Sequence, residues 1–194
     1  MTQETTVNAV DAGELRNAFG QFGTGVTVVT TRGADGTPHG ATVNAFTAVS
    51  LDPPLAQVTL PRSSKAARLL ESAPFAINIL SVDQLDTAML FAGRRMNREP
   101  DWIPDGNVPV LLGNAATLEC KPWNLYDGGD HIIVVGEVTA LKVNKVEPLL
   151  FLGGKFRHVG DHIEDRPWVQ SGEGLAVGWF AGVDSFTKFG STRT

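Results

Sequence analysis

Residues 40–54 read Gly-Ala-Thr-Val-Asn-Ala-Phe-Thr-Ala-Val-Ser-Leu-Asp-Pro-Pro and carry the clearest structural signal in the chain. β-Branched, aromatic and apolar side chains are typical of an extended, half-buried strand. Those present here are Thr42, Val43, Phe46, Thr47, Val49 and Leu51. The prolines of Asp52-Pro53-Pro54 end the pattern, because proline cannot donate to a strand ladder and restricts the residue before it. We therefore expect one strand from about Gly40 to Leu51.

Short polar side chains interrupt this strand at Thr42, Asn44, Thr47 and Ser50. Hydroxyls and an amide on a stiff scaffold can hydrogen-bond a planar ligand that is rich in heteroatoms. The alternative is an ordinary strand whose polar residues face water, which is common in antiparallel sheets. The residues of this stretch leave both interpretations open.

The bulk properties predict one globular domain. The chain has 194 residues, with 42% hydrophobic and 19% charged residues, which is ordinary for a soluble protein. A formal charge of −5 argues against a nucleic-acid partner. No apolar run approaches the roughly 20 residues of a membrane span. Cys120 is the single cysteine, so we expect a buried core thiol and a cytoplasmic protein.

The pattern along the chain predicts a mainly β fold. We expect helices over 13–22, 65–71 and 83–91, and strands over 26–31, 40–51, 55–60, 75–80, 115–126, 132–143 and 149–159. Leu15, Ala18, Phe19 and Phe22 fall at helical spacing and form one apolar stripe. Residues 93–114 form a long connection of the kind that often serves as a functional flap. Many strands, few helices and repeated hairpins favour an antiparallel β-barrel with helical decoration.

Both ends of the chain differ from this body. Residues 1–11 are polar and acidic without a basic segment, so we expect a flexible arm and not a signal peptide. Residues 160–194 combine glycine with aromatic residues, among them Trp168, Trp179, Phe180 and Phe186. Aromatic content argues against disorder, so we expect this extension to pack on the domain or on a partner subunit.

Several blocks, in order, resemble the flavin reductase-like family, the small split-barrel reductases that supply reduced flavin to two-component monooxygenases. Besides residues 40–54, these are 19–30 (FGQFGTGVTVVT), 61–65 (PRSSK), 128–131 (GGDH) with 135–138 (VGEV), and 154–157 (GKFR). The resemblance covers residues 12–158 and implies an antiparallel Greek-key split β-barrel, which we place at residues 12–159. It also implies FMN or FAD, with NADH or NADPH as co-substrate, and a homodimer that holds flavin near the subunit interface.

The resemblance also implies the binding residues. Flavin contacts would come from Thr42, Val43, Asn44, Ala45, Phe46, Thr47 and Ser50, from Ser63, Ser64 and Lys65 on the phosphate side, from Phe91, Ala92, Gly93 and Arg94, and from Phe156. Ser63, Ser64 and Lys65 suit an anion by their hydroxyls and ammonium, although a plain helix cap explains the serines equally well. The chain departs from the family at Ala45 and Ala48, where serine is more usual, and backbone amides would have to replace those hydroxyls.

His131 follows a Gly-Asp turn where the family places a histidine near the nicotinamide, so the resemblance implies a catalytic His131. The alternative is a turn histidine that bonds its own loop. His158, Asp161 and His162 stand close together, but no fourth ligand accompanies them and we expect no metal site.

Three functions follow from these observations. The first is an NAD(P)H-dependent flavin reductase whose reduced flavin diffuses to a monooxygenase. The second is an FMN-retaining flavoenzyme that acts directly on an organic substrate, favoured by Ala45, Ala48 and an aromatic extension able to cover the nicotinamide site. The third is a non-catalytic flavin-binding module, because one fold serves many functions. We expect the first.

Overall fold

The computed structural model describes residues 10–104 and 106–161. Within these residues lie ten strands, three α-helices and one 3-10 helix. The elements are α1 (Ala12–Phe19), β1 (Thr24–Gly25), β2 (Thr27–Arg32), β3 (Pro38–Val43), β4 (Phe46–Leu51), β5 (Pro54–Pro61), α2 (Lys65–Leu70), β6 (Phe75–Ile79), η1 (Val82–Gln84), α3 (Leu85–Phe91), β7 (Ala116–Gly128), β8 (His131–Val143), β9 (Leu150–Leu152) and β10 (Lys155–Arg157). The predicted arm and extension lie outside the described residues, apart from the few positions next to the domain.

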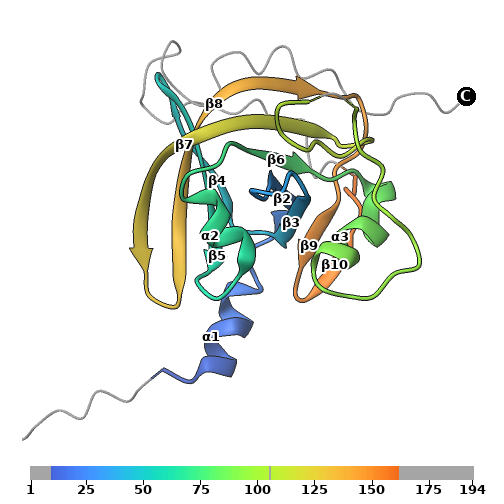
Figure 1. Ribbon diagram of the computed structural model, residues 1–194. Helices are drawn as coiled ribbons and strands as arrows, with labels where there is room; N and C mark the ends of the chain where they lie inside the picture. The colour runs from blue at the N-terminus through green and yellow to red at the C-terminus, as the bar shows by residue number, and fades with distance from the viewer. Residues whose placement is uncertain (1–9, 105, 162–194) are drawn as a thin grey trace, which may run out of the picture. The chain divides into compact units, whose positions relative to one another are not determined.

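The main sheet has seven antiparallel strands in the order β3-β2-β6-β7-β8-β5-β4 (Figure 1). Its two edge strands, β3 and β4, follow one another in the chain, with only Asn44 and Ala45 between them. Three residue steps from Val43 to Phe46 span at most roughly 11 Å. A flat sheet of this width would separate its edges by roughly 29 Å, at about 4.8 Å per strand. The sheet must therefore curl until its edges meet, which makes a split barrel of the predicted class.

This result corrects the prediction of one strand from Gly40 to Leu51. The stretch forms two strands that lie at opposite edges of the sheet and are separated by a bend at Asn44. The side chains also differ in exposure, because β3 is half-buried along its length while β4 is mostly exposed. Of the polar residues that interrupt the pattern, only Asn44 lies at this change of direction.

Tight turns set the register of the hairpins. Gly36, at φ 79°, completes the β2–β3 turn, and Gly129, at φ 76°, completes the β7–β8 turn. Glycine adopts positive φ without strain, which explains its place in both. The predicted hairpin across 127–130 is confirmed, although both strands reach further into the turn, until Gly128 pairs with His131.

The barrel encloses the larger of the described apolar clusters. Phe75, Leu60, Leu70 and Ile77 are fully buried there, and α2 covers one end of this cluster. Cys120 belongs to it, as predicted, and desolvation raises the pKa of its thiol to about 12. A second cluster lies under α3 and includes Val26, Val28, Leu80 and Leu149.

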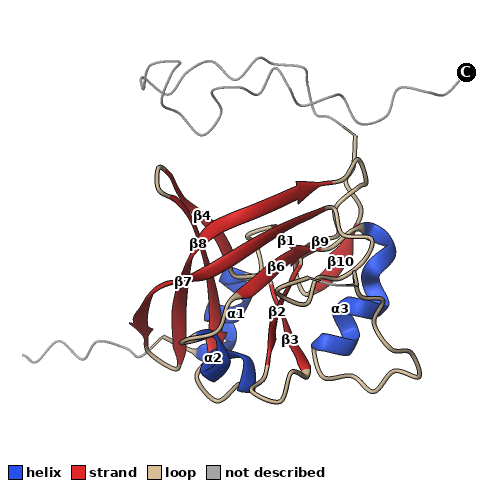
Figure 2. Ribbon diagram, turned by 45° about the horizontal axis from the view of Figure 1, so that its top comes forward, coloured by secondary structure: helices blue, strands red, loops and turns tan. Residues whose placement is uncertain are grey.

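A small second sheet of order β1-β9-β10 stands beside the barrel (Figure 2). The predicted closing strand over 149–159 is therefore a hairpin of two short strands, broken by Gly153 and Gly154 at positive φ. The predicted helix over 13–22 ends at Phe19, and none of its residues is buried. In Figure 1, α1 projects below the barrel, and its apolar stripe has no cover within the described residues. Among those residues, no helix is long and apolar enough to cross a membrane.

Candidate functional site

The bend at Asn44 and Ala45 is held on both sides by hydrogen bonds. The Thr42 hydroxyl donates to the Ala88 carbonyl of α3 at 2.7 Å. On the other side, the Thr59 amide of β5 donates to the Ala45 carbonyl at 3.0 Å. The side chains of Asn44 and Ala45 are themselves exposed. A rigid backbone thus presents an amide side chain to solvent at the point where the barrel edges meet.

Phe91 lies directly against β3 because Gly40 has no side chain. A Cβ at Gly40 would lie 2.7 Å from two Phe91 ring carbons. Phe91 also packs edge-to-face on Trp102, with ring centroids 6.0 Å apart. Ala92, Gly93 and Arg94 form the turn that ends α3, with Gly93 at φ 91° and the Arg94 side chain exposed.

Phe156 joins the same apolar cluster from β10. Its ring meets Phe151 edge-to-face at 5.3 Å, and both rings pack against the buried residues under α3, as Phe91 and Trp102 do. The structure therefore brings Phe91 and Phe156, which are far apart in sequence, to one cluster.

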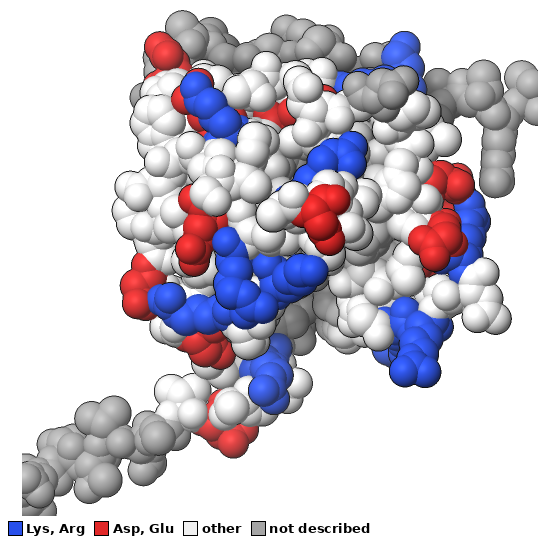
Figure 3. Space-filling view, in the orientation of Figure 1, with Lys and Arg blue, Asp and Glu red and all other residues white. Residues whose placement is uncertain are grey.

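The turn from Pro61 to Lys65 leads from β5 into α2. Ser64 caps the helix, because its hydroxyl accepts from the Ala67 amide at 3.1 Å, so the plain-cap interpretation holds for this serine. Ser63 and Lys65 are exposed. Figure 3 shows basic side chains gathered over α2, the helix that carries Lys65 and Arg68, on a chain whose net charge is negative. Such a local concentration of positive charge favours an anion.

His131 begins β8 and pairs with Pro61, so it lies beside this turn. Its Nδ1 is 2.6 Å from Oδ1 of Asp130. The hydrogen bond and charge of His131 lower the pKa of Asp130 below its ordinary value, which keeps Asp130 ionised. A carboxylate that accepts from Nδ1–H leaves Nε2 as the nitrogen available to a ligand.

The predicted residues divide by position. Asn44 and Ala45, the 61–65 turn and His131 lie at one end of the neighbouring strands β4, β5 and β8. Ser50 pairs with Leu55 and lies roughly 16 Å along β4 from Ala45, at about 3.3 Å per residue, so the structure does not bring it to this group. Phe46 turns its ring toward the barrel core, and Val43 gives its carbonyl to the Thr27 hydroxyl. Thr47 is exposed on β4 opposite Gln57.

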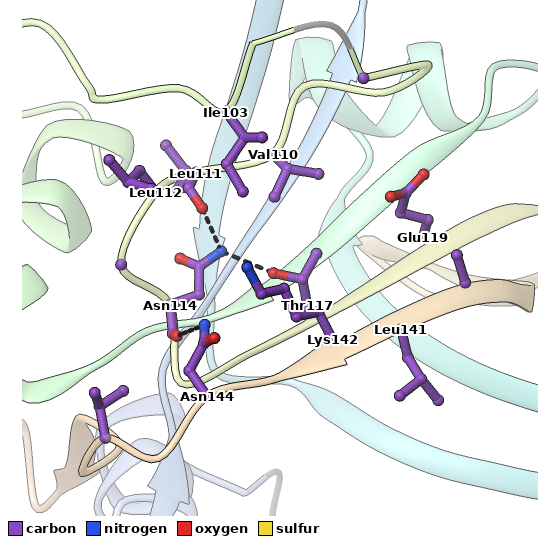
Figure 4. Close-up of a pocket in the computed structure, with 14 residues that line it drawn as sticks. Ile103, Val110, Leu111, Leu112, Asn114, Thr117, Glu119, Leu141, Lys142 and Asn144 are labelled. Atoms are coloured by element: carbon purple, nitrogen blue, oxygen red, sulfur yellow. Dashed lines mark hydrogen bonds between the residues drawn. The ribbon is translucent and has the colours of Figure 1, made fainter.

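The described surface has cavities elsewhere. One of about 540 Å³ lies between the 103–114 connection and the ends of β7 and β8 (Figure 4). At its inner wall, the Asn114 amide donates to the Leu111 carbonyl and to the Thr117 hydroxyl. A second, of about 330 Å³, borders α3 and the 96–101 segment. No predicted flavin residue lines either of these two cavities. Asn44, Ser63 and Lys65 are exposed, whereas Phe46, Phe91 and Phe156 are half-buried against the apolar clusters.

Sequence reasoning missed three residues that shape this surface. Gly40 admits Phe91, and glycine within a β-branched strand is a usual sign of such a close approach. Trp102 backs Phe91 from the long connection, but no local pattern marks it. Arg62 belongs to the 61–65 motif, which indicates no separate role for it. Its side chain and backbone nevertheless contact the β7–β8 turn.

Comparison with known proteins identifies this arrangement. Residues 19–160 match the family described as flavin reductase like domain. An NADH-dependent FAD reductase of Streptomyces globisporus is 40% identical over 163 residues, covering 78% of this chain and 87% of that protein. An FMN reductase (NADH) of Agrobacterium fabrum is 45% identical over 146 residues, covering 73% of this chain and 83% of that protein.

A solved structure points to the same family as these two relatives. The NADH:FAD oxidoreductase of Streptomyces globisporus, in complex with NAD and FAD fragments, has a TM-score of 0.73 and 37% identity, covering 79% of this chain and 96% of that one. Some other curated relatives are longer, and the chain spans about half of their length. The family match over most of the barrel, together with relatives matched over most of their own length, shows that the chain belongs to the flavin reductase-like domain family.

Proposed function

We propose that the chain is a flavin reductase that uses NADH to reduce FMN or FAD, and that the reduced flavin serves a partner monooxygenase. The observation that carries this proposal is the meeting of the Asn44 bend, the 61–65 turn and His131 at one end of the barrel. Relatives at 35–40% identity are named as reductase components of monooxygenases, which supports the choice of partner.

The residues fit a flavin by their chemistry. A flavin ring edge presents donors and acceptors, and Asn44 offers both from an exposed amide. Lys65 and the Ser63 hydroxyl offer a charge and a donor for a phosphate, beside the other basic residues over α2. When bound, the flavin itself accepts the hydride from the nicotinamide. The chain needs only to bind and orient the two molecules, and His131 supplies an imidazole beside the 61–65 turn.

The phosphate assignment is tested with Lys65→Ala. Loss of a charge-assisted hydrogen bond costs about 1.5–3 kcal/mol, so we expect flavin affinity to fall by roughly ten- to a hundred-fold. Flavin fluorescence titration measures this. The matched control is Lys145→Ala, because Lys145 is also an exposed lysine and lies on the connection after β8. Unchanged affinity in Lys65→Ala would remove the phosphate assignment.

The activity is tested separately. Anaerobic stopped-flow mixing of the full chain with FMN or FAD and with NADH or NADPH should bleach the flavin absorbance, faster with NADH. Absence of bleaching with every pair, in protein that binds flavin, would contradict the reductase function and leave a flavin-binding module.

A further inference from the structure

Arg62 joins two turns through both its backbone and its side chain. Its amide donates to the Asp130 carbonyl at 3.1 Å, and its Nε donates to the Gly129 carbonyl at 2.8 Å. Its Nη2 lies 2.7 Å from Oδ2 of Asp127. A single residue thus holds three positions of the four that make the β7–β8 turn.

The two turns it joins carry the two halves of the proposed site. Arg62 directly precedes Ser63, and Asp130 directly precedes His131. The ladder between β5 and β8 ends at the Pro61–His131 pair, so Arg62 lies just beyond the last strand-to-strand contact. Without the Arg62 side chain, the turn would keep its pairing within the β7–β8 hairpin and with Pro61, but it would lose its side-chain contacts to the 61–65 turn.

The Asp127 carboxylate, which pairs with Arg62, is also held by a contact within its own turn. Asp127 accepts from the Gly129 amide at 2.8 Å, and this bond, together with the Arg62 charge, lowers the pKa of Asp127 below its ordinary value. Asp127 is therefore ionised at neutral pH. With Nε and Nη2 committed to the turn, two of the directions in which arginine would otherwise fork around a phosphate are already used.

We propose that Arg62 is a positioning residue that holds the His131 turn at a fixed place beside the 61–65 turn, rather than a ligand of the flavin phosphate. The inference rests on the proposed function of this site. Displacement of a reacting group by about an ångström can lower a reaction rate by a large factor. An exposed ion pair contributes little to folding stability. We therefore expect loss of the Arg62 side chain to affect the rate of hydride transfer more than the stability of the protein.

The test compares Arg62→Gln with Asp127→Asn, which break the same ion pair from opposite ends. We expect both to lower the rate of flavin reduction at low NADH on the order of ten-fold, while flavin affinity stays within about two-fold of wild type. Lys121→Gln is the control, because Lys121 of β7 pairs with Glu137 of β8 at 3.0 Å, away from the β7–β8 turn. It should leave both quantities unchanged.

The His131→Ala variant distinguishes a positioning role of Arg62 from a general structural role. If Arg62 acts through His131, then Arg62→Gln adds no further loss in the His131→Ala background, since residues that act as a unit are not additive. A full additional loss, or His131→Ala with the wild-type rate, would overturn the inference.

Two further outcomes separate the alternatives. If Arg62→Gln weakens flavin binding as Lys65→Ala does while Asp127→Asn does not, Arg62 is a phosphate ligand and the inference is wrong. If both variants match wild type, the contact has no role in positioning. Failure of wild-type protein to reduce flavin would instead contradict the proposed function.

Discussion

Thr42 shows what a single residue can and cannot reveal in sequence. Its position predicts a polar group on the candidate strand, and the residue does lie in β3, two residues before the bend at Asn44. Its hydroxyl, however, donates to the Ala88 carbonyl and fastens α3 to β3. Ser64 differs, because its hydroxyl caps α2 through the Ala67 amide three residues away, a local role that the helix-cap interpretation included. For Thr42, the sequence shows a polar side chain, but its partner Ala88 comes from a distant segment, so its role was not predictable.

Gly40 allows a test at the same scale. Gly40→Ala places a Cβ 2.7 Å from the Phe91 ring and 3.2 Å from Thr30 Cγ2, so the ring must shift. Overpacking of this kind costs about 1–3 kcal/mol. We expect reduced stability in urea denaturation, and weaker flavin binding by the folded protein because Phe91 is displaced.

Two other glycines separate the effect on stability from the effect on flavin binding. Gly136→Ala would place a Cβ 2.5 Å from Phe75 and 2.8 Å from Cys120, so it should also destabilise the protein, yet without an effect on flavin affinity. Gly25→Ala meets nothing within 4 Å and should change stability by less than about 0.5 kcal/mol. Equal flavin affinity in Gly40→Ala and Gly136→Ala would contradict a role for Phe91 in the site.

At the scale of elements, composition predicted where most strands lie, and hairpin turns predicted which ones pair. The central strands and α2 agree with expectation to within a few residues, because β-branched runs and glycine turns are local signals. The separation of β3 from β4 was missed, since residues 40–51 contain no glycine or proline at the bend. Their assignment to opposite edges depends on pairing with β2 and with β5, which no local pattern encodes.

A buried polar network fixes the long connection to the barrel. Asn78 of β6 is fully buried and donates to the Val28 carbonyl and the Thr30 hydroxyl. Its Oδ1 accepts from the Leu111 amide at 3.0 Å and from Asn114 Nδ2 at 2.9 Å. The connection predicted to be a flap is therefore anchored at 111–114.

Asn78→Ala removes all four of these bonds and leaves the Leu111 amide without its acceptor. Buried groups left unsatisfied cost about 1–3 kcal/mol each, so we expect a loss of about 2–4 kcal/mol in unfolding free energy. Hydrogen exchange at the Leu111 amide should also become faster. Asn17→Ala, on the exposed α1, should cause no loss. Wild-type exchange at Leu111 in the Asn78 variant would show that the connection is held by other contacts.

At the scale of the whole molecule, the curled sheet explains why the candidate site lies where it does. The bend that joins the barrel edges lies where β5 ends and β8 begins, so closure of the barrel gathers segments that are far apart in sequence. The fold class was predictable from strand-rich patterning, and the resemblance supplied the candidate residues. The exposure of Asn44, Ser63 and Lys65 was not predictable, because it depends on which distant segments pack beside them.

Exposed apolar side chains favour the predicted homodimer. In α1 and the turn after it, Leu15 is 41% exposed, Phe19 68% and Phe22 78%. The edge strand β4 also exposes Leu51, at 68%. Exposed apolar surface and open strand edges are usual at protein interfaces. A second copy seated on α1 would cover this apolar surface.

The dimer is tested by placing charge on the apolar surface of α1 and the turn after it. Sedimentation of the full chain at micromolar concentration should give twice the 20.7 kDa chain mass. Phe19→Glu combined with Phe22→Glu should give monomers that bind flavin more weakly, because the desolvation of two carboxylates opposes association. Leu141→Glu is the matched control, since Leu141 is 68% exposed on β8 and lies outside α1. A wild-type monomer at every concentration would exclude the dimer, and dissociation by Leu141→Glu alone would place the interface on β8 instead of on α1.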